Sequence, residues 1–198
     1  MDASLAWSKL AERAAYSGFV RVRVDTYRTG SGSVSDWDVI EQDDCVFVLA
    51  FTEAGTALVF EQFRVGPRRV LPELPGGLVD PGEEPVAAGL RELREETGFA
   101  GAAHWYAGSE WVAASSTRRK HAVIVGGCRR VAEPEWGADE SGVVREVEPG
   151  ALLTALLNGE QSDSGAGMRA LLRFARANEV PAGLTALQRE IRTALCPY

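Results

Sequence analysis

The chain has 198 residues, of which 45% are hydrophobic and 25% are charged, and its formal net charge at pH 7 is −7. This length and composition predict one packed domain with room for flanking elements. The negative charge disfavours a general nucleic-acid-binding protein, whose affinity comes from neutralising phosphates, but it leaves room for a nucleotide substrate held by a few local cations.

Several classes of membrane and secreted protein are also disfavoured. The sequence has no apolar run of about eighteen residues, the length that a membrane-spanning helix needs. Its first residues lack a basic segment followed by an apolar one, so no secretory signal is visible. Cys45, Cys128 and Cys196 are an odd number with no close pair, which argues against a disulfide framework or a zinc site. We therefore expect a cytoplasmic protein with no membrane partner.

The N-terminal stretch predicts a helix followed by strands. Residues 4–15 carry apolar side chains at helical spacing, whereas residues 19–26 alternate valines with polar residues, as in a half-buried strand. A second strand is expected at 34–41, after a turn rich in glycine and serine. We expect these strands to form a small antiparallel region apart from the main sheet, within an N-terminal part covering residues 1–42 that contributes to dimerisation.

The main domain is expected over residues 43–180. Residues 45–51 form a continuous apolar run, which is typical of a central strand covered on both faces, and residues 57–63 complete a hairpin with it. The segment 72–85 is rich in glycine and proline and predicts a long ordered loop. A helix is expected over 85–97, with a proline in its first turn and a glycine after its end.

The rest of the chain alternates strands and helices. Strands are expected at 103–111, 121–131 and 143–147, and helices at 149–159 and 164–178, with a last amphipathic segment at 184–195 inside a C-terminal extension covering residues 181–198. This order of elements predicts an α/β fold of the α/β/α sandwich type, with helices on both sides of a mixed sheet.

One predicted helix carries three carboxylates on a single surface. Glu92 and Glu96 are four residues apart, and Glu95 is three residues from Glu92, so all three lie near one another on the helix. Their mutual repulsion is only partly offset by Arg91 and Arg94. Hard divalent cations such as Mg²⁺ or Mn²⁺ would remove it, because they prefer carboxylate oxygens. The alternative is a solvated acidic helix with ordinary ion pairs.

The loop before this helix complements the carboxylates. Gly76 and Gly77 allow close approach of the backbone, so a carbonyl group there would complete a metal shell. Arg91 can pair with Glu83 or Glu95 and hold them in place. An apolar stripe at helical spacing is expected to anchor the helix to the sheet: Val86, Leu90, Leu93 and Thr97.

The spacing of these residues resembles the Nudix box. Gly77 is followed after five residues by Glu83, and after seven more by the run Arg-Glu-Leu-Arg-Glu-Glu-Thr-Gly-Phe at 91–99. Every defining position of the box is matched. The resemblance implies the Nudix fold and an enzyme, a pyrophosphohydrolase that acts on phosphorus-containing anhydrides.

Further segments resemble the ADP-ribose pyrophosphatase, or nucleoside-diphosphate-sugar hydrolase, branch of this family. The similarity covers about residues 19–176 and is concentrated in 59–99. It implies a homodimer, often with exchanged N-terminal strands, and about two or three Mg²⁺ or Mn²⁺ ions. Those ions would be held by the first and last glutamate of the box helix, the loop backbone and an acidic residue on a late loop.

The resemblance assigns the metal ligands residue by residue. Glu92 and Glu96 match the two principal ligands, Glu95 is a third, and Gly76 matches the backbone carbonyl. The late acidic residue falls in the stretch 138–141, where counting back from a later Asn-Gly pair favours Glu140. An ordinary solvated carboxylate is the equal alternative for Glu140.

Two residues before the box are candidates for substrate binding. Arg64 follows a strand that leads into the box loop, so its planar guanidinium would contact phosphate or ribose, with a surface ion pair as the alternative. Glu73 would either bind substrate or brace the loop.

One loop departs from the ADP-ribose pattern. Where the resembled enzymes carry a Ser-Pro-Gly loop followed by an acidic residue, this chain has Arg118, Arg119 and Lys120. We expect Arg118 and Arg119 to bind a more anionic substrate. An exposed basic hairpin tip is the alternative.

The resulting hypothesis is hydrolysis of a nucleoside diphosphate linked to another moiety. ADP-ribose, giving AMP and ribose 5-phosphate, is the first substrate, and another nucleotide sugar is the second. Glu95 or Glu140 would orient or deprotonate the attacking water, and Arg91 would hold the glutamates. The alternatives are a nucleoside triphosphate pyrophosphohydrolase and a Nudix-fold nucleotide-sugar sensor without catalysis.

Overall fold

The computed structural model describes residues 5–137 and 141–195, and the chain divides into two compact units. The first unit consists of Met1–Asp44 together with Trp111–Arg119, and the second of Cys45–Glu110 together with Lys120–Tyr198. The domain boundaries expected near residues 42 and 180 stay a prediction. No helix in the described part of the chain is long and apolar enough to cross a membrane.

The first unit contains a three-stranded antiparallel sheet with the order β1-β2-β3. Its strands are β1 (Ser8–Ser17), β2 (Arg21–Arg28) and β3 (Val34–Glu41). The helix expected at residues 4–15 is therefore wrong, because β1 occupies most of that stretch. Register shifts between Lys9 and Ala11 and between Ala14 and Tyr16 interrupt the strand's alternation, so its apolar residues recur at a spacing that resembles a helix. Pairing with β2 overrides the local helical preference.

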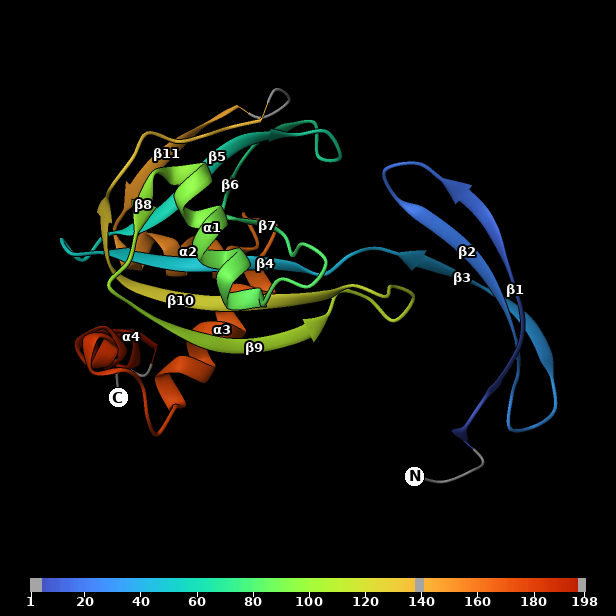
Figure 1. The fold of residues 1–198 in the computed structure, drawn as a ribbon. Helices are drawn as coiled ribbons and strands as arrows, with labels where there is room; N and C mark the ends of the chain where they lie inside the picture. The colour runs from blue at the N-terminus through green and yellow to red at the C-terminus, as the bar shows by residue number, and fades with distance from the viewer. Residues whose placement is uncertain (1–4, 138–140, 196–198) are drawn as a thin grey trace. The chain divides into compact units, whose positions relative to one another are not determined.

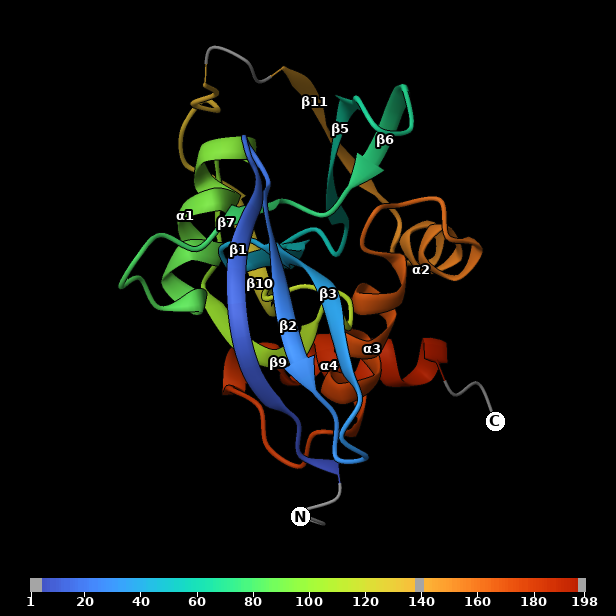
Figure 2. The same ribbon diagram turned by 90° about the vertical axis from the view of Figure 1, so that its right-hand side faces the viewer.

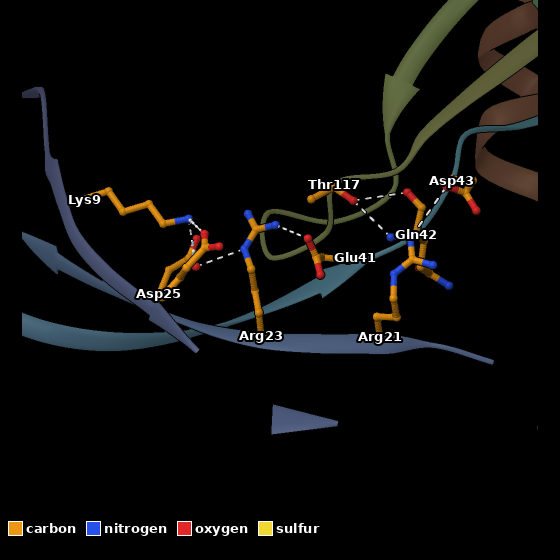
Figure 3. A network of polar contacts seen from close by, with 9 residues as sticks. Lys9, Arg21, Arg23, Asp25, Glu41, Gln42, Asp43 and Thr117 are labelled. Carbon is orange, nitrogen blue, oxygen red and sulfur yellow. Dashed lines mark hydrogen bonds and ion pairs between the residues drawn. The ribbon is translucent and has the colours of Figure 1, made fainter. Parts of the chain in front are cut away.

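A buried carboxylate organises one part of this sheet (Figure 3). Asp25 is only 1% exposed, and it pairs with Lys9 at 3.0 Å and accepts a hydrogen bond from Nε of Arg23 at 2.9 Å. Arg23 also forms an ion pair with Glu41 on β3. Burial opposes ionisation of Asp25, but the hydrogen bonds from Arg23 and Lys9 outweigh it and lower the pKa of this carboxyl. The three strands are thus tied together by charge as well as by their backbone ladder.

The second unit is built on a mixed sheet, which has eight strands among the described residues. The path β11-β5-β4-β10-β8 forms its spine, while β6 pairs with β5, β7 with β4, and β9 with β10. The strands are β4 (Cys45–Thr52), β5 (Ala57–Arg64), β6 (Arg69–Glu73), β7 (Gly76–Leu78), β8 (Phe99–Ala100), β9 (Ala103–Trp111), β10 (Arg119–Arg130) and β11 (Gly142–Val147). Strand β4 pairs in parallel with β10 and antiparallel with β5 and β7. The segment expected as one loop before the box helix therefore contains β7 and the end of β6.

Helices cover both faces of this sheet, as Figures 1 and 2 show. Alternate residues of β4 face opposite sides of the sheet. One side packs against a single helix through Val46, Val48 and Ala50, and the other side contributes Phe47 and Leu49 to a second core. The helices are α1 (Pro85–Thr97) on the first face, and α2 (Pro149–Asn158), α3 (Ser164–Arg176) and α4 (Thr185–Leu195) on the second. The predicted α/β/α sandwich with a mixed sheet is confirmed.

Candidate active site

Helix α1 is placed by its ends. Pro85 occupies its first turn, where the missing N–H is not needed. Gly98 ends the helix in the left-handed conformation with a φ of 75°, and its N–H donates to the carbonyl of Arg94 at 2.8 Å. A Cβ at Gly98 would lie 2.2 Å from the carbonyl oxygen of Ala132, so a larger residue does not fit. The carboxylates therefore lie in the last two turns of a helix with a fixed end.

The inner face of α1 lies directly on the sheet. Leu93 and Thr97 are fully buried, and Val86 and Leu90 are partly buried against the same core, which confirms the predicted apolar stripe. Gly89 completes this face, because a Cβ there would lie 3.2–3.3 Å from valine side chains of β4 and β10. This close packing favours one rotation of the helix about its axis, and that rotation sets the direction of the three glutamates.

The glycine loop, which we define as Gly76 and Gly77 at the start of β7, lies against two of these glutamates. The N–H of Gly76 donates to Oε2 of Glu96 at 2.7 Å, and Glu96 is 8% exposed. A Cβ on Gly77 would lie 2.4 Å from Oε1 of Glu92, so only glycine lets the carboxylate approach the backbone this closely. Pairing of β7 with β4 holds the loop in this place. The close approach that the two glycines predict is therefore present.

Arg91 joins three glutamates. Its Nη1 donates to Glu92 at 2.8 Å and to Glu95 at 3.0 Å, while Nε and Nη2 form a fork on Glu83 at 3.1 and 3.0 Å. Nη2 also donates to the carbonyl of Leu78 at 3.1 Å. These contacts raise the pKa of Arg91, chiefly through Glu83, and the hydrogen bond from Arg91 lowers the pKa of Glu83. The expected pairing of Arg91 with Glu83 or Glu95 occurs with both, and Glu92 is a further partner.

Arg64 and Glu73 form a second polar group. Nε of Arg64 donates to Oε2 of Glu73 at 2.7 Å, and Gln62 donates to the same oxygen at 3.2 Å. Glu73 is 3% exposed, whereas the side chain of Arg64 is 45% exposed. The hydrogen bond with Glu73 raises the pKa of Arg64, and the charge of Glu96 adds to this shift. Glu73 thus holds an arginine that is open to solvent and within electrostatic reach of the box.

Comparison with known proteins decides the family. The NUDIX domain model matches residues 42–163. This chain belongs to the Nudix family. The ADP-ribose pyrophosphatase of Bacillus subtilis is 34% identical over 97 residues, which cover 48% of this chain and 52% of the relative. The methanol dehydrogenase activator of Bacillus methanolicus is 32% identical over 80 residues, which cover 40% and 43% of the two chains.

Other comparisons agree on the fold. The ADP-ribose pyrophosphatase of Mycobacterium tuberculosis is 37% identical over 79 residues, covering 39% of this chain and 38% of the relative. A solved structure described as an ADP compounds hydrolase has a TM-score of 0.72 at 19% identity and covers 85% of this chain and 93% of that one. The Nudix chain spans about half the length of the first of these curated relatives and less of the others.

The oxygen donors of the Nudix site fit a hard divalent ion that takes only some of its ligands from the protein. Among the described residues, no three His, Cys, Asp or Glu side chains are arranged to hold an ion by themselves. Mg²⁺ does not require such a cage, because it is usually held by one or two carboxylates, several waters and substrate phosphates. Glu92 and Glu96, set against the backbone of Gly76 and Gly77, supply that smaller set.

Three further residues of the Nudix chain are predicted to belong to the site: Glu140, Arg118 and Arg119. Glu140 lies outside the described residues. Arg118 and Arg119 belong to the first unit, where Nε of Arg118 donates to the carbonyl of Asp43 at 2.6 Å and the guanidinium of Arg119 lies 4.8 Å from the ring centre of Trp111. Their role in substrate binding stays a prediction.

Sequence reasoning missed Gln62 as a partner of Glu73 and Asp163 as a partner of Lys120. The alternation of β5 carried the first signal, since Gln62 and Arg64 are two residues apart and share a face of the strand. Asp163 immediately precedes α3, a position where an acidic residue is common and its contact with a distant lysine is not encoded locally.

Proposed function

We propose that this Nudix protein is a divalent-metal-dependent pyrophosphohydrolase that cleaves a nucleoside diphosphate linked to another moiety. The observation that carries the proposal is the carboxylate face of α1, where Arg91 holds Glu92 and Glu95 while the glycine loop lies against Glu92 and Glu96. A solvated acidic helix would need neither the glycine contacts nor an arginine shared by three glutamates.

ADP-ribose is the proposed first substrate, with water giving AMP and ribose 5-phosphate. The names of relatives in Bacillus subtilis and Mycobacterium tuberculosis support this choice, and so does the ADP-sugar pyrophosphatase of Mus musculus, which is 30% identical over 94 residues. Another nucleotide sugar is the second candidate, because the basic residues Arg118 and Arg119 stand where ADP-ribose enzymes carry an acidic residue.

Within the site, Glu92 and Glu96 and the carbonyl of Gly76 would hold Mg²⁺ or Mn²⁺. The ion would supply positive charge that offsets the negative charge developing on the diphosphate oxygens. Glu95 would orient a water molecule and accept its proton, since its carboxylate is fixed by Arg91 at 3.0 Å. Arg64 would bind phosphate or ribose through its open guanidinium, and Glu73 would keep that guanidinium in place. Glu140 is a second candidate for the base and for a ligand.

We further propose that the protein is a cytoplasmic homodimer and that the first unit contributes to the interface. The first unit exposes several large apolar side chains, among them Trp37 on β3, Trp7 just before β1, and Phe19 between β1 and β2, which is 95% exposed. All ten residues of β1 are exposed. Three strands with this much exposed apolar surface are typical of an interaction region.

A substrate screen tests the proposed activity. Purified protein is incubated with ADP-ribose, other nucleotide sugars, dinucleotides and nucleoside triphosphates, with Mg²⁺, with Mn²⁺ or with a chelator, and the products are separated chromatographically. We expect AMP and ribose 5-phosphate from ADP-ribose in the presence of metal and no products with the chelator. Absence of cleavage of every compound would favour a sensor without catalysis, and preference for triphosphates would contradict the nucleotide-sugar assignment.

A further inference from the structure

The C-terminal end of α1 is held by a distant segment. The last carbonyl groups of a helix have no partner within it and need one from elsewhere. In α1, the N–H of Glu135 donates to the carbonyl of Glu95 at 2.7 Å, and the indole Nε1–H of Trp136 donates to the carbonyl of Glu96 at 2.9 Å. Two protein groups thus replace water at the residues that carry the proposed base and a proposed ligand.

Trp136 also contacts the sheet through its ring. Its ring lies 5.7 Å from that of Phe60 at an interplanar angle of 42°, and Phe60 is 1% exposed. The segment before it is attached to the helix end as well, because the N–H groups of Val131 and Ala132 donate to the carbonyl of Gly98 at 2.8 and 3.1 Å. Trp136, which is 39% exposed, therefore acts as a brace that links Phe60 of β5 to the last turn of α1.

This brace acts on residues that are held a second time through their side chains. Glu96 is fixed at its carbonyl by Trp136 and at its carboxylate by the N–H of Gly76. Glu95 is fixed at its carbonyl by Glu135 and at its carboxylate by Arg91. Helix ends fray when their carbonyls lack partners, so loss of the indole N–H would loosen the backbone from which both carboxylates project.

We infer that Trp136 is a positioning residue that aligns the carboxylates of α1 toward a divalent ion. The inference rests on the proposed function, because it concerns the same carboxylates. It assigns to Trp136 no contact with substrate or ion: the indole acts through the peptide groups of the last helical turn. A site that is misaligned by a fraction of an ångström loses affinity even when every ligand is present.

The test is Mn²⁺ binding to Trp136→Phe, measured by calorimetry without substrate. Phenylalanine keeps the ring against Phe60 but removes the N–H. Trp105→Phe is the matched control, because Trp105 also packs on a phenylalanine, Phe174, at 5.4 Å, in the core on the other face of the sheet. We expect Trp136→Phe to weaken Mn²⁺ binding about threefold to tenfold, as loss of one hydrogen bond predicts, and Trp105→Phe to leave it unchanged.

Two further measurements separate positioning from stability. Amide hydrogen exchange in the last turn of α1 should be faster in Trp136→Phe than in Trp105→Phe, and the Mg²⁺ concentration for half-maximal activity should rise while kcat at saturating Mg²⁺ changes less than about twofold. If Trp136→Phe does not fold, Trp136→Tyr is measured in the same way. Equal Mn²⁺ affinity in the altered and unaltered proteins would overturn the inference. Absence of Mn²⁺ binding by the unaltered protein would also overturn the inference, whereas the proposed function is decided separately by cleavage in the substrate screen with Mg²⁺ or Mn²⁺.

Discussion

Gly76 donates its backbone N–H to Oε2 of Glu96 across 2.7 Å. This bond joins the glycine loop to the last turn of α1 and gives a largely buried carboxylate a partner. An amide oxygen can accept the same bond, whereas an amide side chain carries no charge for a divalent ion. The structural and the chemical contributions of Glu96 can therefore be separated by one substitution.

Glu96→Gln should remove most activity and leave the fold intact. Loss of one ligand is expected to reduce kcat by about a thousandfold, since several kcal/mol of transition-state stabilisation depend on the ion. The measurement is turnover at saturating Mg²⁺, with the melting temperature recorded alongside. Glu190→Gln, at an exposed position of α4, is the control and should match the unaltered protein. Near-normal turnover in Glu96→Gln would show that this residue is not a ligand.

The pair of Glu83 and Arg91 should make part of the stability depend on pH. The hydrogen bond from Arg91 lowers the pKa of Glu83 below its ordinary value of 4.5. The pair therefore stabilises the folded state above about pH 4.5, and this contribution disappears as the pH falls through the lower pKa of the folded protein. Urea denaturation of the unaltered protein and of Glu83→Gln should show a difference in unfolding free energy near neutral pH that shrinks on acidification. A difference that is constant with pH would contradict the assigned pairing.

The central elements could be predicted because their signals are local. The apolar run of β4 requires cover on both faces, and the spacing of Glu92, Glu95 and Glu96 requires a helix. β1 could not be predicted, because bulges near Lys9 and Ala14 remove its alternation. The sequence of β1 favours a helix until its partner strand is known.

The site can be predicted only where it is formed by residues that are close together in the sequence. The box residues lie on one helix and its preceding loop, so their spacing is sufficient. The indole of Trp136 reaches the carbonyl of Glu96 over 40 positions, and the guanidinium of Arg118 reaches the carbonyl of Asp43 over 75. A backbone carbonyl is present at every residue, so no side-chain pattern marks the one that is used.

Arg64→Ala should distinguish substrate binding from bracing. Removal of the arginine leaves Glu73 buried without its cation, so we expect the free energy of unfolding to fall by about 1–3 kcal/mol. Glu73→Gln in the same chain should recover part of that loss, because it removes the buried charge. If Arg64 also contacts the diphosphate or ribose, Arg64→Ala should raise KM for the best substrate. This increase in KM should be larger than any increase caused by Glu73→Gln alone. A fall in stability with unchanged KM would leave Arg64 as the partner of Glu73 alone.

The oligomeric state provides a separate prediction. Light scattering at micromolar concentration should give twice the chain mass of 21.3 kDa, about 43 kDa. Trp37→Ser should shift the protein toward the monomer if the apolar side chains of the first unit form the interface. Val65→Ser is the control, because Val65 is 84% exposed in the second unit. A monomer at all concentrations would exclude the proposed dimer, and equal dimer stability in Trp37→Ser and the unaltered protein would place the interface elsewhere.

The basic residues Arg118 and Arg119 allow the sharpest test of substrate preference. Both have partners within the first unit: Arg118 binds the carbonyl of Asp43, and Arg119 lies over the ring of Trp111. Their double replacement by alanine should therefore lower stability slightly, by about 0.5–1 kcal/mol for the cation–π contact. This expected loss of stability is larger than the loss for a solvated hairpin tip, whose cations contribute almost nothing to stability.

If these arginines also bind substrate, the same double variant should raise KM about tenfold or more, because each charge-assisted contact contributes about 1.5–3 kcal/mol. The effect should be greatest for the substrate with the most negative charge near the scissile bond. Replacement of Arg129 and Arg130, exposed at the other end of β10, controls for the loss of two positive charges and should leave KM unchanged. An equal effect of the two double variants would indicate long-range electrostatics. Unchanged kinetics with lowered stability would make the contacts with Asp43 and Trp111 the whole role of the pair, and the departure from the ADP-ribose pattern would then carry no information about substrate.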